Sequence, residues 1–379
     1  MIKLIDLNYH THSGISNPEE VMELQKASIG FVEFIKEKLS IELIKHLNYQ
    51  GEKYVNGVKY RFFKSNNKFW YIPFKTHKYI QKQNPDIVLI QGFIFPLQLI
   101  FLKFKLPKKT KIMVQHHGEK PFRGIKMLFQ KIADHYIDLY LFTSVENANE
   151  WIEKKIIPDK KKCCELLEAS TFFKSKDKLQ CKLRLSFSGN QNFLWVGRLN
   201  IGKDPMTVLN AFEKYIIVCP EARLFMIYHT EELLPVIKRK LNENEQLKKA
   251  VLLKGKVNHS ELETWYHAAD FFISGSHKEG SGYALIEAMF CGCIPVVTDI
   301  PSFRTITANG DCGLLYEAGN ENALLATLIQ TIQMDLQEKR EKALEHFKNR
   351  LSFEAIAEAL SGICEKLVSG LSPMATAQQ

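Results

Sequence analysis

Two cations stand five residues apart in the segment FLWVGRLNIGKDP, where Arg198 and Lys203 flank Gly202. The apolar run before them, Phe193–Gly197, predicts a strand, so both side chains fall in the loop after the end of that strand. Arg can bind a phosphate bidentately, and Lys can act as a mobile point charge. Such charge-assisted bonds contribute about 1.5–3 kcal/mol each. A diphosphate site is one interpretation of this pair; two solvated loop cations are the other.

A second loop combines glycines with acids in the segment FFISGSHKEGSGYALIEAMFCGCIPVVTDIP. Gly280 and Gly282 let the backbone approach a ligand, and a helix predicted from about Gly282 to Phe290 presents N–H groups to an anion. Glu279 and Glu287 would repel a phosphate, but a carboxylate can accept two hydrogen bonds from a vicinal diol. A nucleotide sugar carries both groups and is one interpretation of this loop; a solvated Glu279 and a capping Glu287 on an ordinary βαβ unit are the other.

The same loop also resembles part of a dinucleotide-binding fingerprint. GSGYAL supplies two of the three glycines, and Asp299 stands about where a ribose-binding acid would lie. Leu285 occupies the third glycine position and would crowd the helix against the sheet. An NAD-dependent dehydrogenase therefore remains an alternative to nucleotide-sugar chemistry.

The strands and helices that must position these loops are predicted to alternate regularly along the chain. Short apolar runs separated by 10–20-residue helical patterns indicate βαβ units and parallel sheets. Two sets of runs predict two doubly wound α/β domains. The predicted strands are Lys3–Leu7, Ile41–Leu47, Val58–Phe63, Ile87–Gln91, Lys111–Gln115, Leu139–Thr143, Phe193–Gly197, Arg223–Tyr228, Ala250–Leu253, Phe271–Ser274, Ile294–Thr298 and Gly313–Tyr316.

A polar stretch over residues 170–192 predicts the domain boundary. We expect an N-terminal domain over residues 1–175 and a C-terminal domain over 176–350. Residues 320–348 predict one closing helix, and residues 353–367 predict a second. That last helix, within residues 351–379, is expected to pack back toward the N-terminal domain.

The charge distribution and the cysteines of the 379-residue chain indicate where in the cell the protein works and what it could bind. Residues 1–170 hold 27 Lys and Arg against 18 Asp and Glu, whereas residues 171–379 hold 24 of each. The whole excess of +9 therefore lies in the front half. The eight cysteines show no zinc spacing or C-x-x-C pair, which favours reduced thiols in the cytoplasm. No apolar run approaches the ~20 residues that span a bilayer.

Together the two loops resemble the retaining glycosyltransferases of family 4, which have the GT-B fold. The resemblance rests on VGRLNIGK, then EGSGYALIEAMFCGCIPVV, then GDCGLLY, in the order that the family has them. It covers most of residues 193–318, and the front half matches more loosely through NPDIVLIQG, IMVQHHGE and LYLFTSVEN. It implies two Rossmann-like domains facing across a cleft, with the acceptor on the first and the nucleotide-sugar donor on the second.

The resemblance also assigns roles. It implies that Arg198 and Lys203 neutralise the leaving diphosphate, that Glu279 and Gly280 contact the transferred sugar, and that Glu287 binds the nucleotide ribose. No metal and no cofactor is expected, since the chain lacks the Asp-x-Asp motif with which glycosyltransferases of the other fold class, GT-A, hold a metal. The predicted catalytic residues are Arg198, Lys203, Glu279 and His117. The predicted donor-binding residues are Gly14, Arg198, Lys203, Lys256, Val257, Glu279, Gly280, Ser281, Gly282, Tyr283, Ala284 and Glu287.

His116 and His117 follow the run Lys111–Gln115 and precede Gly118. In the family that the chain resembles, a His before such a Gly often lies near the reacting centre. The prediction for an acceptor-binding or sugar-positioning residue is therefore His117 first and His116 second. Two polar loop histidines without a role are the alternative.

The positive charge of residues 1–170 bears on which partners the protein binds besides its substrates. Residues 97–111, LQLIFLKFKLPKKTK, mix apolar side chains with five lysines, and KPFRGIKMLFQK follows with four more cations. Such a surface suits anionic lipid, and lysines solvated on a core-facing helix are the alternative. Nucleic acid is not expected, because no recognised module accompanies the charge.

The sequence favours a cytoplasmic hexosyltransferase acting on a carbohydrate or lipid-linked acceptor, with a location at the inner membrane face as a further expectation. Its physiological role, bacterial surface-polysaccharide or glycolipid assembly, is what the resemblance implies. A nucleotide-sugar epimerase or phosphorylase on the same fold and a non-catalytic sugar-nucleotide binding protein stay open beside the dehydrogenase.

Overall fold

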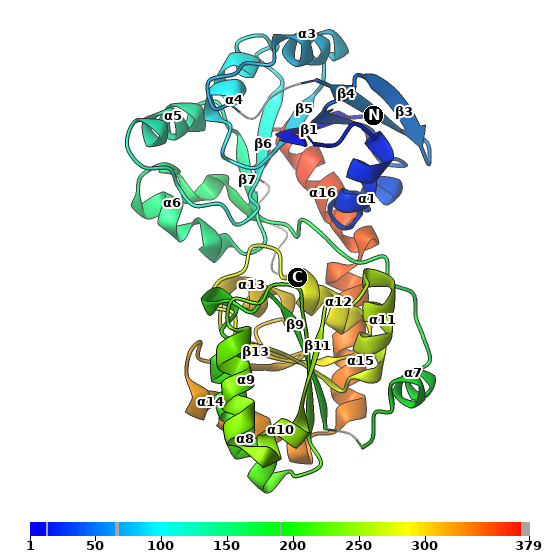
Figure 1. Cartoon of the computed structure of the whole chain (residues 1–379). Helices are drawn as coiled ribbons and strands as arrows, with labels where there is room; N and C mark the ends of the chain where they lie inside the picture. Colours follow the sequence, from blue (N-terminus) through cyan, green and yellow to red (C-terminus); the bar gives the residue numbers. More distant parts are fainter. Residues whose placement is uncertain (13, 65–67, 190, 373–379) are drawn as a thin grey trace. The chain divides into compact units, whose positions relative to one another are not determined.

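The computed structural model describes residues 1–12, 14–64, 68–189 and 191–372. The chain divides into two compact units (Figure 1). Unit 1 comprises Met1–Ser170 together with the last segment from Phe353, and unit 2 comprises Thr171–Ser352. The chain thus leaves unit 1 a few residues before the division expected at residues 175 and 176, and its last helix is part of unit 1.

Unit 1 is built on a sheet of eight strands among the described residues, in the order β3-β4-β2-β1-β5-β6-β7-β8. Every neighbouring pair is parallel except β3 and β4, which form an antiparallel hairpin. The order reverses between β1 and β5. The strands are β1 Lys3–His12, β2 Ser40–Leu47, β3 Gly51–Val55, β4 Val58–Phe63, β5 Ile87–Gln91, β6 Lys111–Gln115, β7 Leu139–Phe142 and β8 Cys163–Glu165.

Helices cover both faces of this sheet (Figure 1). The last helix, α16, packs against α2, and the other face holds a core of apolar side chains around Val88, Ile112 and Trp151. The helices of unit 1 are α1 Pro18–Ile29, α2 Val32–Ile35, α3 Phe74–Gln83, α4 Pro96–Lys103, α5 Ile125–Asp134, η1 Val145–Ala148, α6 Asn149–Glu153, η2 Lys160–Lys162 and α16 Phe353–Val368.

Unit 2 has a sheet of six parallel strands among the described residues, in the order β11-β10-β9-β12-β13-β14. Numbered within the unit, this is the 3-2-1-4-5-6 order of dinucleotide-binding α/β folds, and the order reverses between β9 and β12. The strands are β9 Asn192–Gly197, β10 Arg223–Tyr228, β11 Val251–Gly255, β12 Phe271–Ser274, β13 Ile294–Thr298 and β14 Leu314–Tyr316.

Two groups of helices flank this sheet (Figure 1). One contains α8, α9, α10 and α14, over a core that includes Phe193, Phe212 and Phe271. The helices of unit 2 are α7 Lys178–Leu185, η3 Ile201–Lys203, α8 Pro205–Val218, α9 Leu234–Glu243, α10 Glu245–Ala250, α11 His259–Ala268, α12 Tyr283–Phe290, α13 Pro301–Ile306, α14 Glu321–Gln330, η4 Thr331–Gln333, α15 Leu336–His346 and η5 Phe347–Leu351. No helix in the described part of the chain is both long and apolar enough to cross a bilayer.

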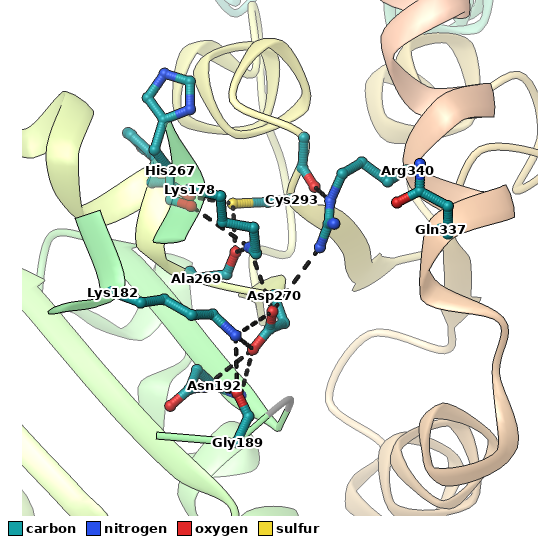
Figure 2. A network of polar contacts seen from close by, with 12 residues as sticks. Lys178, Lys182, Gly189, Asn192, His267, Ala269, Asp270, Cys293, Gln337 and Arg340 are labelled. Atoms are coloured by element: carbon teal, nitrogen blue, oxygen red, sulfur yellow. Dashed lines mark hydrogen bonds and ion pairs between the residues drawn. The ribbon is translucent and has the colours of Figure 1, made fainter. Parts of the chain in front are cut away.

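A buried carboxylate fastens the start of unit 2 to its sheet (Figure 2). Asp270, fully buried just before β12, lies 3.2 Å from Lys178 Nζ, 2.9 Å from Lys182 Nζ and 3.8 Å from the guanidinium of Arg340. Its other oxygen accepts a bond of 2.9 Å from the side-chain amide of Asn192 in β9. The network therefore joins α7, α15 and two strands at the edge of the sheet opposite the carboxyl ends.

The prediction of one helix over residues 320–348 is wrong, because the structure has two α-helices there, α14 and α15. The two are divided at η4 and Met334, after which Asp335 starts α15 by accepting bonds from the backbone N–H groups of Gln337 and Glu338. An N-cap of this kind stops the preceding helix, because the capping residue has extended backbone angles.

Candidate functional site

A cavity of about 480 Å³ opens in unit 2 at the carboxyl ends of its strands. Its walls follow β9, β10 and β12, so it lies at the point where the strand order reverses. Open α/β sheets bind their ligands at this switch point. The lining residues are Val196, Gly197, Arg198, Lys203, Ile227, Tyr228, His229, Lys256, Val257, Leu262, Phe272, Ser274, Glu279, Gly282, Tyr283, Ala284, Leu285 and Phe303.

The loop after β9 brings two cations to the cavity. The Asn200 side chain accepts a bond of 3.0 Å from the Lys203 backbone N–H, which closes the short helix η3 and fixes the loop. Asp204 takes a left-handed conformation with φ 39° and caps α8 through Thr207. Arg198 is exposed at the cavity wall and forms no ion pair with the residues that the structure describes.

The loop after β12 brings a carboxylate and a helix start to the same cavity. Gly282 has φ +64°, and a Cβ there would lie 2.6 Å from Ile306 Cδ1, so both conformation and space require glycine. The helix α12 begins next, without a side-chain cap among the described residues, and its first residues Tyr283 and Ala284 line the cavity. The N-terminal end of α12 thus offers partial positive charge to an anion.

Two pairs of opposite charge lie in and beside this cavity. The Lys203 ammonium contacts the Glu279 carboxylate, and both side chains are more than two thirds buried. His277 Nε2 lies 3.0 Å from Asp204 Oδ2 at the start of α8. A diphosphate that bound Lys203 would have to replace Glu279, and the freed carboxylate could then accept hydrogen bonds from hydroxyl groups.

Glu287 lies deeper along α12 and is not part of the cavity wall. Its Oε1 is 2.8 Å from Nε2 of His259, the first residue of α11. The His259 ring also packs against Phe173, with ring centroids 4.9 Å apart and the ring planes tilted by 38°. The predicted ribose contact of Glu287 would thus require His259 to yield its bond or share it.

The structure brings most predicted donor-binding residues of unit 2 together. Those at the cavity are Arg198, Lys203, Lys256, Val257, Glu279, Gly282, Tyr283 and Ala284. Gly280, Ser281 and Glu287 are outside its wall, and Gly14 belongs to unit 1. The roles of all these residues stay predictions. Tyr228 and His229 were missed, although they end and follow β10 and the strand-end rule would have found them.

The two predicted histidines of unit 1 follow β6 in different environments. His116 is buried; its Nδ1 accepts from the Gly118 N–H at 3.2 Å, and its Nε2 donates to the Glu119 carbonyl at 2.9 Å. His117 has its side chain partly exposed, and its backbone N–H donates to the Glu119 carboxylate at 2.7 Å. Their acceptor-binding roles stay predictions.

A chain of polar contacts orients His117. The Gln91 amide donates to Asp6 Oδ2 at 2.7 Å, so its oxygen faces His117 and accepts from Nε2 at 2.7 Å. The other ring nitrogen, Nδ1, contacts the buried carboxylate of Glu168. The ring therefore carries a proton on Nε2, which it donates to Gln91. Sequence reasoning missed Asp6, Gln91 and Glu168.

The far end of this chain is a buried ion pair at the carboxyl side of the sheet. Lys45 Nζ lies 3.9 Å from Asp6 Oδ1, and both side chains are at least nine-tenths buried. Burial raises the pKa of Asp6, against the opposing effect of the Lys45 ammonium. Burial likewise lowers the pKa of Lys45, and the Asp6 carboxylate opposes that shift.

Among the described residues, no group of three or more His, Cys, Asp or Glu side chains could hold a metal ion.

The fold and the site together define a two-domain GT-B architecture with a ligand cavity in the second domain. Residues 183–350 match the family described as "Glycosyl transferases group 1". The alpha-monoglucosyldiacylglycerol synthase of Streptococcus pneumoniae is 25% identical over 196 residues, which are 51% of this chain and 44% of that protein. The GDP-mannose:cellobiosyl-diphosphopolyprenol alpha-mannosyltransferase of Xanthomonas campestris is 27% identical over 125 residues, 33% of each chain. The chain therefore spans less than half the length of these relatives.

Solved structures match over nearly the whole chain. A glycosyltransferase from Rickettsia africae matches with a TM-score of 0.70 at 15% identity, covering 97% of this chain and 98% of that one. The Anabaena protein HepE, in complex with UDP and glucose, matches with a TM-score of 0.67 at 13% identity, covering 97% and 100%. At such identities the likeness shows the fold, and it confirms the GT-B class predicted from the sequence.

Proposed function

We propose that the protein is a retaining, metal-independent glycosyltransferase that moves a hexose from a nucleoside-diphosphate sugar to a hydroxyl acceptor. The observation that carries the proposal is the cavity of unit 2, where two cations, the start of α12 and one carboxylate meet at the strand switch point. Breaking a glycosyl–phosphate bond develops negative charge on the leaving diphosphate. Fixed cations and a helix N-terminus aimed at that charge stabilise it without a metal.

The division of labour within the cavity follows from the charges. Arg198 and Lys203 bind the diphosphate, and Glu279, once released from Lys203, accepts hydrogen bonds from the sugar hydroxyls. The nucleoside lies toward Lys256 and Val257, after β11. Retention is supported by the two relatives, whose names specify alpha products.

The acceptor is proposed to bind unit 1 near His117. The contacts of this histidine with Gln91 and Glu168 engage both ring nitrogens, so it orients a substrate rather than acting as a free base. The relatives' names specify diacylglycerol and polyprenol-linked acceptors, which supports a lipid-linked or carbohydrate acceptor and a role in bacterial glycolipid or surface-polysaccharide assembly. We place the protein in the cytoplasm, at the inner face of the cell membrane.

A thermal-shift panel tests the donor class. Nucleoside diphosphates, their sugars and nicotinamide dinucleotides are each added to the full chain. A ligand at 100 times its Kd stabilises by about 2.7 kcal/mol, which gives a measurable shift. Stabilisation by at least one nucleotide sugar is expected, and its transfer to a trial acceptor would separate a transferase from a binding protein. A shift with nicotinamide dinucleotides alone would overturn the proposal.

A further inference from the structure

Part of unit 1 exposes large apolar side chains among lysines and an arginine. They come from three neighbouring parts of the chain: the turn and start of α3, helix α4 with its end, and helix α5, of which α4 and α5 are in contact (Figure 1). We call this the basic apolar surface; its exposed apolar members are Trp70, Phe74, Phe101, Phe104, Ile125, Leu128 and Ile132.

Ring contacts connect these parts into one surface. Trp70 meets Phe129 of α5 with centroids 5.6 Å apart, and Phe74 of α3 meets Phe101 of α4 at 6.4 Å. Lys105 Nζ lies 5.9 Å from the centre of the Phe74 ring. Aromatic contacts thus link the turn to α5 and α3 to α4, with a lysine ammonium beside the Phe74 ring.

Two interpretations of the basic segments around α4 and α5 were given from the sequence: a lipid-binding surface, or a core-facing helix with solvated lysines. The exposure of helix α5 distinguishes between them. Ile125, Leu128 and Ile132 repeat at spacings of three and four, which places them on one stripe of the helix. That stripe is exposed, with Ile125 exposed by 66%. A core-facing helix that solvates only its lysines would bury the stripe. Isolated exposed leucines need no explanation, but seven large exposed side chains on neighbouring elements mark an interaction surface.

The positive charge around the basic apolar surface indicates which kind of partner it binds. Residues 68–134 hold thirteen Lys and Arg against three Asp and Glu. In the described part of the chain, none of Lys105, Lys108, Lys109 and Lys126 forms an ion pair. A second copy of the chain would bring the same positive charge and be repelled. Apolar side chains ringed by cations match an anionic lipid surface, which attracts Lys and Arg and admits aromatic and aliphatic groups.

We propose that the basic apolar surface docks onto anionic phospholipid, with Phe104, Ile125 and Leu128 entering the headgroup layer and the lysines contacting lipid phosphates. This deepens the proposed function, on which its biological meaning rests, since a lipid-linked acceptor lies in such a membrane. The binding itself needs no catalysis and is measured without donor or acceptor.

Vesicle co-flotation of the full chain tests the proposal. Vesicles of phosphatidylcholine alone are compared with vesicles that also contain phosphatidylglycerol, at low and physiological ionic strength. Partition onto the anionic vesicles is expected, with a steep loss as salt rises. Equal partition onto both vesicles, partition that ignores salt, or no partition onto either would overturn the proposal.

Variants locate the surface. Removing three cations in Lys105→Ala/Lys108→Ala/Lys109→Ala should lower the partition coefficient at low salt about 10²-fold, at roughly five-fold per cation. Removing two apolar groups in Ile125→Ser/Leu128→Ser should lower it at least about ten-fold at either salt. The matched controls in unit 2, Ile217→Ser and Lys238→Ala, replace exposed side chains and should change nothing. Equal losses in the controls would refute the location.

Trp70 provides a probe within the surface itself. It is exposed by 61%, whereas Trp151, Trp195 and Trp265 are buried. Adding anionic vesicles should shift the intrinsic fluorescence to the blue, and Trp70→Phe should lose the shift while it keeps binding. A shift that persists in Trp70→Phe would place the contact elsewhere. The thermal shift caused by a nucleotide sugar should stay the same in every surface variant, because these residues lie outside the cavity of unit 2. Loss of lipid binding with an intact nucleotide shift would therefore concern the membrane proposal alone and leave the proposed function untouched.

Discussion

Asp270→Asn should destabilise unit 2 more than any surface substitution. The change removes the charge that Lys178, Lys182 and Arg340 share, and leaves three cations near a fully buried position (Figure 2). Breaking a buried ion pair by removing one partner costs about 3–5 kcal/mol. For a domain of this size, each kcal/mol lowers Tm by about 2–4 °C, so a loss of about 6–20 °C is expected.

The control is an ion pair of the same chemistry at the surface of the same unit. Asp299 contacts Arg304 at 2.9 Å, but its side chain is 45% exposed. Asp299→Asn should therefore cost at most about 1 kcal/mol. Asp270→Asn combined with Lys182→Met should recover part of the loss, because one uncompensated charge is gone.

Amide hydrogen exchange is the decisive assay, because the two units need not unfold together. In Asp270→Asn, protection should fall in β9 and β12 and stay unchanged in the strands of unit 1. If Asp270→Asn and Asp299→Asn lose stability equally, the buried network does not hold α7 to the sheet and the reasoning fails.

Three further predictions concern the site and the pH dependence of folding. Arg198→Ala and Lys203→Ala should each lower kcat/KM for sugar transfer about 10²–10³-fold, and wild-type rates in either would remove the proposed mechanism. Chelators should leave the transfer rate unchanged in a direct assay, and loss restored by Mg²⁺ would contradict the metal-free proposal. Burial lowers the pKa of His46 to about 4, so the folded state binds fewer protons than the unfolded state between about pH 4 and 6.5. The free energy of unfolding should therefore fall by about 3 kcal/mol as pH falls through that window, and His46→Gln, measured by urea titration at each pH, should flatten the dependence.

Buried parallel strands were predictable because each is a short apolar run with polar residues on both sides. The observed β5, β6, β10, β12 and β13 have the predicted bounds. The strands that were missed lack such a run: Cys163–Glu165 has three residues, and Gly51–Val55 alternates on an exposed edge. The Asn56–Gly57 turn that joins the latter to β4 is a hairpin signal that could have found it.

The two sites differ in how much of them local sequence could predict. In unit 2 many cavity-lining residues follow strand ends, so position along the chain was enough to place Arg198, Lys203 and Glu279 at the cavity. In unit 1 the orientation of His117 depends on Asp6, which is 85 residues from Gln91 in the sequence. Such contacts arise from strand order, which a single sequence does not show, and a buried acid within an apolar run reads as part of the strand.

The ion pair between Lys203 and Glu279 leads to a last prediction, which distinguishes the binding of the diphosphate from the binding of the sugar. The carboxylate compensates the cation, so a diphosphate that binds Lys203 must break the pair and approach a negative charge. Glu279→Gln keeps the size of the side chain and removes both penalties. A nucleoside diphosphate should then bind about five- to ten-fold more tightly, a gain of about 1–1.4 kcal/mol that is typical of a partly buried pair.

The corresponding nucleotide sugar should gain less or nothing, because the amide accepts fewer hydrogen bonds from the sugar hydroxyls than the carboxylate does. Isothermal titration with both ligands measures the difference, and Glu317→Gln, a change outside the cavity wall, is the control. Weaker binding of the bare diphosphate to Glu279→Gln would mean that the carboxylate does not compete for Lys203, and the partner exchange on which the donor assignment rests would have to be given up.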